Sequence, residues 1–537
     1  MEVTIRDEEV AEAASSAAVR LLDDGVPARL AAGDPGLWGE EAAAGAATRL
    51  GWLNLPLTSR ELLPEIGKLA EWAGAQGLTN VVLAGMGGSS LAAEVICDTA
   101  DVPLTVLDTS DPRQVRRALA DDDLDRTVLV VASKSGTTVE TDAALRVFEA
   151  AFRAAGIDPG DRIVVVTDPG SPLEQAAIDA GYQMVLARPD VDGRYSALSA
   201  FGLVPSALAG AEIERLLDDA DEVTPLLARS AGNPGLDLGA VLGGAALAGR
   251  DKLILEDRLA QITGLPGWIE QLVAASLGKD GRGILPVVAA DPSGAGDELV
   301  VAIGSDNGDV RVDGALGAQF LVWEYATALA GRLLEVDPFG RPDVAGAERN
   351  TAALLEHLPA AELPAFTDGP VEVYGPTAAR DLPGLLAELL AAVPRDGYLA
   401  VLAHLDRLAA FDAPVRDGAD FEEMTDAWMA ADAATLRALL ALRTDRPVTF
   451  GWGPRYLHAT GQYHKGGPRN GVYVLITGVV EDDLGVPGRP YGLGGLQLAQ
   501  ALGDLQALAG RGRPAVRLHL TDRVTGVAHL LAAAQEA

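Results

Sequence analysis

Cysteine is almost absent from this sequence, since Cys97 is the only one among 537 residues. A single thiol cannot form an intramolecular disulfide framework, which excludes the small disulfide-stapled scaffolds and fits a reducing compartment. Long apolar runs are also missing, because no uninterrupted stretch is long enough to span a bilayer. The polar, acidic opening MEVTIRDEEV does not resemble a signal peptide. The composition therefore predicts a cytoplasmic protein with no membrane partner.

Basic residues are scarce relative to acidic ones. Lys and Arg number 42 against 77 Asp and Glu, which gives a formal net charge of −35. Nucleic acids and anionic membranes are bound through concentrated Lys and Arg, so this charge disfavours both as partners. A diffuse acidic excess is typical of a surface that maintains solubility. Any anionic ligand must therefore be held by a local site that works against the overall field.

What the sequence does contain is enough apolar material for packed domains. Hydrophobic residues make up 48% of the chain and charged residues 22%, a balance typical of folded rather than disordered proteins. At about 100 to 200 residues per domain, a chain of this length is expected to form two to four domains.

Short β-branched runs alternate with amphipathic stretches from residue 81 onward. The strands expected in a first series are 81–85, 103–108, 127–133, 161–168 and 183–188. Those expected in a second, less regular series are 251–256, 298–305, 371–375, 398–404, 447–451, 472–477 and 515–520. Continuous apolar strands that alternate with helices predict parallel sheets covered on both faces. We therefore expect an α/β fold with two doubly wound parallel-sheet lobes and additions at both ends.

This alternation also suggests a domain division. We expect an N-terminal helical segment at 1–75, a first sheet lobe with a ligand cradle at 76–235, and a second sheet lobe at 236–390. A C-terminal α/β segment at 391–537 would carry the HKGGP loop.

Two corners of the first lobe combine glycine with hydroxyl side chains. GMGGSS (85–90) follows the first expected strand, and SKSGTT (133–138) follows the third. In an open parallel sheet, ligands bind outside the carboxyl ends of the strands. Glycines let backbone N–H groups approach an anion, helix N-termini supply partial positive charge, and hydroxyl groups donate without adding net charge. The two corners together predict a phosphate cradle.

Two other interpretations apply to the same corners. A dinucleotide site needs G-x-G-x-x-G and an acid after the second strand; Asp108 supplies the acid, but Ser90 stands at the sixth position, so that fingerprint is incomplete. SKSGTT also reads as a capped turn, with Thr137 or Thr138 as N-cap and Glu140 in the first helical turn. Capping and ligand binding can coexist at one helix end.

Longer motifs carry a family resemblance. They are VVLAGMGGSSLAAEVI, VVASKSGTTVET, DGRYSALSAFGLVP, GWIEQLVAASLGKDGRGILPV, FLVWEYATALAGRLLEVDPFGRPDV and TGQYHKGGPRNGVYVLIT. In this order, and over roughly residues 50–535, the chain resembles the sugar isomerase (SIS) domain proteins, specifically the glucose-6-phosphate isomerases. It is most similar to the actinobacterial branch whose isomerase lobe is often associated with transaldolase.

The resemblance implies SIS-type sheet lobes and an aldose-ketose isomerase that interconverts glucose 6-phosphate and fructose 6-phosphate through a cis-enediolate. It implies a place in glycolysis and gluconeogenesis, a phosphosugar substrate, no cofactor and no metal. It also implies a homodimer, for which the apolar helices expected within 315–335 could cover an interface.

The resemblance assigns binding roles to the two corners. The residues it implies for the 6-phosphate are Ser133, Lys134, Ser135 and Thr138. Those whose backbone it implies on the sugar side are Gly87, Gly88 and Ser89.

The resemblance also assigns catalytic roles. Arg194, in DGRYS, would stabilise the enediolate; its alternative is a salt-bridged surface Arg in a glycine-containing turn. His464, in GQYH, would help to open the sugar ring, and the adjacent Lys465 would donate to a ring or leaving oxygen. A satisfied structural histidine is the alternative for His464.

The proton-transfer base is the point at which this sequence departs from the family. Isomerisation needs a base, commonly a carboxylate, that moves a proton between C1 and C2. Relatives supply it as the Glu of a stretch resembling A-E-S-x-G-K, whereas this chain has AASLGK with Ala275 at that position. Glu270 lies about 140° around an ideal helix, Ser276 is a weak base without an activating partner, and Asp280 is the best nearby carboxylate.

A second motif is altered as well. Where relatives show N-P-F-D-Q and a later lysine, this chain reads DPFGRPDVAGAE, with Gly340 and Arg341 in place of the acid-amide pair and Glu348 in place of the lysine. Changes at two motifs favour natural divergence over deliberate inactivation. Two functions follow: a phosphosugar isomerase with a different base, or a catalytically impaired phosphosugar-binding or regulatory paralogue. The sequence leaves the identity of the phosphosugar open.

Overall fold

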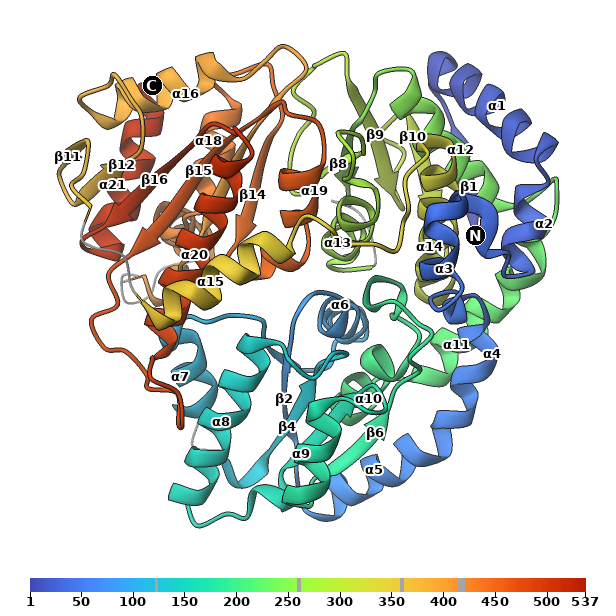
Figure 1. Cartoon of the computed structure of the whole chain (residues 1–537), viewed down its shortest axis with the longest axis horizontal. Helices are drawn as coiled ribbons and strands as arrows, with labels where there is room; N and C mark the ends of the chain where they lie inside the picture. The colour runs from blue at the N-terminus through green and yellow to red at the C-terminus, as the bar shows by residue number, and fades with distance from the viewer. Residues whose placement is uncertain (121–123, 258–261, 358–361, 414–420) are drawn as a thin grey trace.

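The computed structural model describes residues 1–120, 124–257, 262–357, 362–413 and 421–537. Its strands form three sheets, each covered by helices (Figure 1). Parallel strands form the core of every sheet, so the expected α/β fold is confirmed.

The first sheet contains parallel strands only. Its order is β3 (Thr105–Leu107), β2 (Asn80–Gly85), β4 (Thr127–Ala132), β5 (Ile163–Thr167) and β6 (Gln183–Leu186). β4 and β5 are buried along their whole length, as expected of β-branched strands with a helix layer on each face. All five strands expected in the first series are confirmed.

The second sheet has one antiparallel edge. Its order is β1 (Glu2–Ile5), β10 (Val310–Asp313), β9 (Glu298–Ile303), β7 (Lys252–Glu256) and β8 (Leu285–Val287). The N-terminal strand β1 runs antiparallel to β10, and the other pairs are parallel.

The third sheet is mixed. Its order is β11 (Phe366–Asp368), β12 (Val371–Tyr374), β16 (Ala515–Leu520), β15 (Gly471–Gly478), β13 (Tyr398–Ala403) and β14 (Val448–Trp452). β11 and β12 form an antiparallel edge on β16, and the remaining pairs are parallel.

The helices follow the same three groups. Before the first sheet come α1 (Glu8–Asp23), α2 (Val26–Ala31), α3 (Glu40–Ala46), α4 (Leu55–Thr58) and α5 (Leu63–Ala75). Around it lie α6 (Leu91–Thr99), α7 (Pro112–Ala120), α8 (Val139–Ala154), α9 (Pro172–Ala180), α10 (Ala200–Ala209) and α11 (Ile213–Val223). Those of the second group are α12 (Pro234–Leu247), α13 (Leu265–Leu277) and α14 (Leu316–Leu334). Those of the third are α15 (Ala345–Glu356), α16 (Leu382–Ala392), α17 (Phe421–Ala431), α18 (Thr435–Ala441), α19 (Gly461–Gly466), α20 (Leu493–Gly510) and α21 (Arg523–Glu536).

The parallel strands of the three sheets share one connection order. In each, the first parallel strand along the chain is central: β2 lies between β3 and β4, β7 between β8 and β9, and β13 between β14 and β15. The chain therefore adds strands first to one side of the central strand and then to the other. The carboxyl ends of the two strands where this direction reverses flank a crevice, which is the usual ligand position in doubly wound sheets.

Four strands were not expected from the sequence, and each is short. β8 is three residues long and contains Pro286, while β10 reads VRVD and alternates with charge. β1 and β11 lie at sheet edges, where burial imposes a weaker apolar pattern. Strand pairing also crosses two of the proposed boundaries, because β1 joins the second sheet and β12 joins the third. The domain division stays a prediction.

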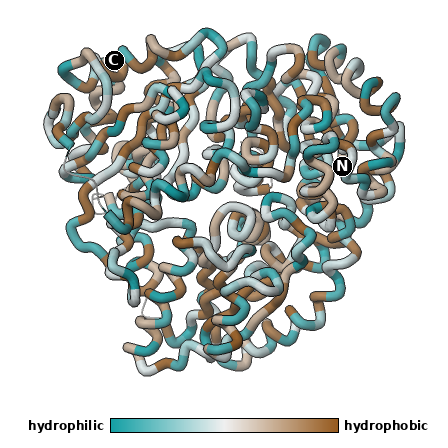
Figure 2. Tube along the Cα trace, viewed as in Figure 1, coloured by the Kyte–Doolittle hydropathy of each residue, from teal (hydrophilic) through white to brown (hydrophobic). Residues whose placement is uncertain are grey.

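Hydrophobic residues concentrate inside the three lobes, and hydrophilic residues predominate at their rims (Figure 2). One core joins the N-terminal helices to residues of the first and second sheets, and a separate core fills the third lobe. α14 is buried along nearly all of its length, so this apolar helix packs inside the chain. No helix in the described part of the chain is long and apolar enough to cross a membrane.

Candidate functional site

The two glycine- and hydroxyl-rich corners lie at the strand reversal of the first sheet. β2 pairs with β4 up to Gly85 and Ala132, so GMGGSS and SKSGTT leave the same edge from neighbouring strands. The fold therefore brings the two predicted corners to the same edge of the first sheet.

The SKSGTT corner is held by its own hydroxyl groups. Ser133 Oγ lies 2.9 Å from Thr138 Oγ1 and accepts a hydrogen bond of 3.1 Å from the Gly136 N–H. Ser135 Oγ lies 2.9 Å from Thr137 Oγ1. These contacts form a compact turn whose hydroxyl groups lead into helix α8.

Thr138 occupies the N-cap position of α8, but its side chain makes no capping hydrogen bond. The capped-turn interpretation is thus confirmed for the backbone position and not for the hydroxyl. A 16-residue helix whose N-terminal N–H groups lack a side-chain cap favours an anion at that end. Lys134 is oriented elsewhere, because its Nζ lies 2.5 Å from Asp168 Oδ2 and 3.2 Å from the Arg188 carbonyl.

The glycines of GMGGSS are required by close packing. A Cβ on Gly88 would lie 1.7 Å from the Gly193 carbonyl oxygen, and one on Gly87 would lie 2.5 Å from Gln271 Nε2. Gly87 also has φ of +56°, a left-handed conformation that glycine tolerates best. Gly87, Gly88 and Ser89 are buried, and protein atoms occupy the space in front of both glycines.

A pocket of about 460 Å³ opens in front of the SKSGTT corner. The residues of the first lobe that line it include Ser135, Thr137, Thr138 and Glu140. The other polar residues that line it are Arg341, Glu348, Thr351, His458, Lys465 and Gln500. Side chains from the first lobe and from the C-terminal half of the chain therefore share one pocket. Gly87, Gly88, Ser89, Arg194, Ala275 and His464 are not among its lining residues.

His458 and Glu140 form the polar wall of this pocket. His458 ends a short 3-10 turn (Arg455–His458) after β14, and its Nε2 lies 3.1 Å from Glu140 Oε1. Gln500 Nε2, from α20, donates to the same carboxylate oxygen across 2.6 Å. Burial raises the pKa of Glu140, but the charge of His458 and these hydrogen bonds lower it by a larger amount. The pKa of Glu140 therefore lies below its usual value. The sequence interpretation did not select these three residues for the site.

Lys465 lines the pocket and forms a buried ion pair. Its Nζ lies 2.5 Å from Asp504 Oδ1, and both side chains are nearly inaccessible to solvent. Tyr456 Oη donates to the other oxygen of Asp504 across 2.9 Å. The ammonium group of Lys465 is therefore fixed in position by α20.

His464 lies one residue earlier but is oriented into the core. Its Nδ1 lies 2.8 Å from Tyr398 Oη, and the side chain is 1% exposed. Burial, with the charges of Lys465 and Arg513, lowers the pKa of His464 well below its usual value. The ring-opening role stays a prediction for His464, and the histidine that faces the pocket is His458.

Arg194 is a buried connector. Its guanidinium pairs with Asp192, with Nε 2.8 Å from Oδ1, and donates across 2.7 Å to the Ala275 carbonyl and also to the Phe339 carbonyl. It is salt-bridged, as the alternative interpretation requires, but it is not a surface residue, since only 2% of it is exposed. Arg194 thereby fixes the DGRYS loop to α13 and to the DPFGR loop. Its role toward an enediolate stays a prediction.

The alternative bases near Ala275 do not reach the pocket. Ala275 is buried on α13, Glu270 and Ser276 lie on the same helix, and Asp280 follows it in an exposed turn with φ of +54°. None of the four lines the pocket. Burial raises the pKa of Glu270 to about 8, with the Arg455 charge opposing it. Among described residues around this helix, no carboxylate takes the place of the missing Glu at the pocket wall.

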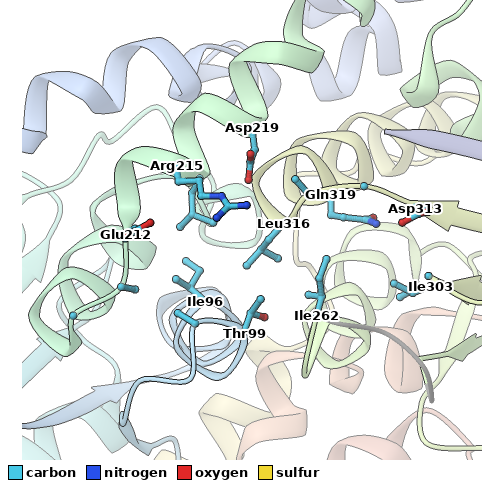
Figure 3. A pocket seen from close by; sticks show the side chains of 17 residues that line it. Ile96, Thr99, Glu212, Arg215, Asp219, Ile262, Ile303, Asp313, Leu316 and Gln319 are labelled. Atoms are coloured by element: carbon cyan, nitrogen blue, oxygen red, sulfur yellow. The ribbon is translucent and has the colours of Figure 1, made fainter.

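A larger cavity of about 990 Å³ lies between the first and second sheet lobes (Figure 3). Arg215 and Asp219, from α11, and Thr99, from α6, are among the residues that line it. The acidic residues Glu212, Asp219 and Asp313 outnumber Arg215 along its lining. This charge disfavours a phosphorylated ligand, and none of the predicted site residues lines the cavity.

Comparisons with known proteins point to one family. The phosphoglucose isomerase family model matches residues 60–234. A probable glucose-6-phosphate isomerase from Haloarcula marismortui is 39% identical over 217 residues, which cover 39% of this chain and 49% of that protein. A glucose-6-phosphate isomerase from Rubrobacter xylanophilus is 33% identical over 258 residues, 44% of this chain and 58% of that protein.

The match in known structures concerns the fold. The crystal structure of a glucose-6-phosphate isomerase from Chlamydia trachomatis aligns with a TM-score of 0.50 at 19% identity, over 60% of this chain and 76% of that one. The chain spans about half the length of the first curated relatives it matches. Residues 60–234, which contain the GMGGSS and SKSGTT corners, therefore match the phosphoglucose isomerase family model, and the chain is similar to glucose-6-phosphate isomerases in sequence over part of its length and in fold.

Proposed function

We propose that the chain is a phosphosugar aldose-ketose isomerase that interconverts glucose 6-phosphate and fructose 6-phosphate. The observation that carries this proposal is the pocket of about 460 Å³, in which an uncapped helix end and hydroxyl groups lie together with His458, Glu140 and Lys465. One wall suits a phosphate dianion and the other offers groups that exchange protons.

The phosphate binds at the start of α8 in this account. Ser135 and Thr138 donate through their hydroxyl groups, and the first N–H groups of α8 supply the remaining donors. Ser133 supports the turn through its contact with Thr138, so its role is to position the other donors. Lys134 makes no direct contact with the phosphate in this arrangement, since it is paired with Asp168 and does not line the pocket.

Ring opening falls to His458. Glu140 holds its Nε2, which leaves Nδ1 as the nitrogen available to a substrate oxygen. A proton must leave O1 and another must reach O5 when the C1–O5 bond breaks. Lys465, fixed by Asp504, donates to an oxygen of the open chain.

A second function is favoured by one specific observation, the methyl group of Ala275 where relatives carry the catalytic Glu. A binding or regulatory paralogue would keep the phosphate wall and lose proton transfer. Fructose 6-phosphate, fructose and inorganic phosphate should be compared by calorimetry, and conversion should be followed by NMR. Both functions predict tight binding of fructose 6-phosphate alone, and only the isomerase predicts formation of glucose 6-phosphate. Equal affinity for fructose and fructose 6-phosphate would refute both.

The proposal includes a cytoplasmic homodimer that acts in glycolysis and gluconeogenesis. The apolar segment expected to cover an interface is α14, which packs inside the chain instead, so it offers no free surface. The dimer therefore rests on the resemblance alone. Light scattering should give about twice the 55.5 kDa chain mass. A monomeric mass at micromolar concentration would remove the dimer from the proposal.

A further inference from the structure

Two residues with carboxylate side chains line the pocket, Glu140 and Glu348. Proton transfer between C1 and C2 needs one base that reaches both carbons, and Ala275 supplies none. These two groups are therefore the pocket's candidates for that task.

Glu140 is already engaged. Its Oε1 is bound by His458 Nε2 at 3.1 Å and by Gln500 Nε2 at 2.6 Å, and the side chain is 5% exposed. These contacts hold the carboxylate against the histidine, where it orients the ring. A carboxylate that moved to a substrate carbon would leave His458 and Gln500 unpaired.

Glu348 differs in each of these respects. It lies in the first turn of α15 and is exposed to the pocket. Among the residues that the structure describes, none forms a hydrogen bond or an ion pair with its carboxylate, which interacts with Arg341 through charge alone. The carboxylate is thus free to approach a ligand.

The orientation of α15 is fixed by its packing. Ala347, Glu348, Thr351, Ala352 and Leu355 follow helical spacing and all line the pocket, so one face of the helix forms a wall. Asn350 Nδ2 donates to the Gly503 carbonyl of α20 across 3.2 Å. Figure 1 shows α15 running between α8 of the first lobe and α20 of the third. Glu348 is the one carboxylate on this face.

Arg341 completes the arrangement. It lines the same pocket, and its electrostatic partners include Asp192, Arg194 and Glu348. A guanidinium beside the base can stabilise the negative charge that develops on oxygen during proton abstraction.

We propose that Glu348 is the base that carries the proton between C1 and C2, with Arg341 stabilising the enediolate; this inference rests on the proposed isomerase function. The Glu348 carboxylate removes the C2 proton of the open-chain aldose. The C–H electron pair becomes the C1=C2 double bond, and the C1=O1 π pair moves to O1. The protonated Glu348 returns its proton to C1, while the proton of O2 is transferred to O1, which leaves a ketone at C2. No oxidant or cofactor enters this balance.

The test compares three variants of the full chain in heavy water with glucose 6-phosphate: Glu348→Gln, Glu348→Asp and the control Glu356→Gln. Glu356 is an acid of the same helix that does not line this pocket. Deuterium at C2 is measured by NMR, and fructose 6-phosphate binding by calorimetry.

We expect Glu348→Gln to bind within about threefold of the unaltered chain and to lose roughly 10² to 10⁴ in exchange rate, the usual effect of a positioned general base. Glu348→Asp should retain part of the rate, and Glu356→Gln should retain all of it. Exchange by Glu348→Gln at the unaltered rate would overturn the inference and leave the isomerase intact. Binding by the unaltered chain without any exchange would overturn the inference together with the isomerase function. No phosphosugar binding at all would instead defeat the proposed function.

Discussion

His458 Nε2 lies 3.1 Å from Glu140 Oε1, although the two residues are 318 positions apart in the chain. Glu140 lies in the first turn of α8, the helix that follows the SKSGTT corner, and His458 follows a strand of the third sheet. The contact joins the first and third lobes at the pocket, so it couples the phosphate wall to the residues proposed for ring opening.

Replacement of this histidine tests its role. We expect His458→Asn to lower kcat by about 10² or more, because general acid-base catalysis contributes that much or more, while KM changes little. His529→Asn is the matched control, since His529 Nε2 also lies 2.9 Å from a carboxylate oxygen, Asp368 Oδ1, and neither residue lines the pocket. Steady-state kinetics check the result, and an unchanged kcat for His458→Asn would assign ring opening elsewhere.

The phosphate wall is tested by removing two hydroxyl groups. Ser135→Ala combined with Thr138→Ala should weaken fructose 6-phosphate binding by about 2 to 3 kcal/mol, since a hydrogen bond to a charged group contributes roughly 1.5 kcal/mol or more. Thr99→Ala serves as control because Thr99 lines the larger cavity instead. Calorimetry measures the affinity for fructose 6-phosphate. If Thr99→Ala lowers this affinity and the Ser135→Ala, Thr138→Ala variant does not, the sugar binds in the larger cavity.

The Lys465–Asp504 pair makes a stability prediction. Both side chains are at most 1% exposed, so Asp504→Asn leaves a buried ammonium without its counter-charge. We expect a loss of about 3 to 5 kcal/mol in the free energy of unfolding. The exposed pair Arg60–Asp218 is the comparison, and Asp218→Asn should cost less than about 1 kcal/mol. Urea unfolding measures both, and equal losses would contradict the assigned burial.

Glu270 makes a prediction about pH. Burial raises its pKa from 4.5 to about 8. Because the folded-state pKa is the higher one, the stability linked to this group is fully present below pH 4.5 and is lost as the pH rises toward 8. Glu270→Gln removes the titrating group, so the variant should gain roughly 1 to 3 kcal/mol over the unaltered chain at pH 8 and nothing near pH 4.5. Thermal unfolding at both pH values checks this, and a gain of equal size at each would contradict the shifted pKa.

Much of the fold could be predicted because buried parallel strands leave a strong pattern. Runs such as TVLVVA are apolar on both faces, and all twelve expected strands coincide with strands of the structure. The antiparallel edge β11 and the short strand β8 leave no such pattern, since edge position and three-residue length weaken the hydrophobic constraint. The strands of the second and third sheets were therefore expected as one series, without their division into two sheets.

The site was predictable in its first lobe and less so elsewhere. SKSGTT combines hydroxyl groups with a helix start within six consecutive residues, so this pattern can be recognised from the sequence alone. The choice between His458 and His464 depends on which side chain faces the pocket, and neighbouring residues do not encode that. Gln500 projects from α20, whose sequence around this position is that of an ordinary apolar helix. The free carboxylate of Glu348 was visible only as a departure from the family pattern.

Deuterium incorporation by the unaltered chain shows directly whether the protein isomerises glucose 6-phosphate. Purified protein is incubated with glucose 6-phosphate in heavy water, and the sugar is followed by NMR. The account predicts that fructose 6-phosphate forms and that the glucose 6-phosphate pool acquires deuterium at C2. Tight binding of the sugar with neither conversion nor label would contradict it and would identify the chain as a phosphosugar-binding protein without isomerase chemistry.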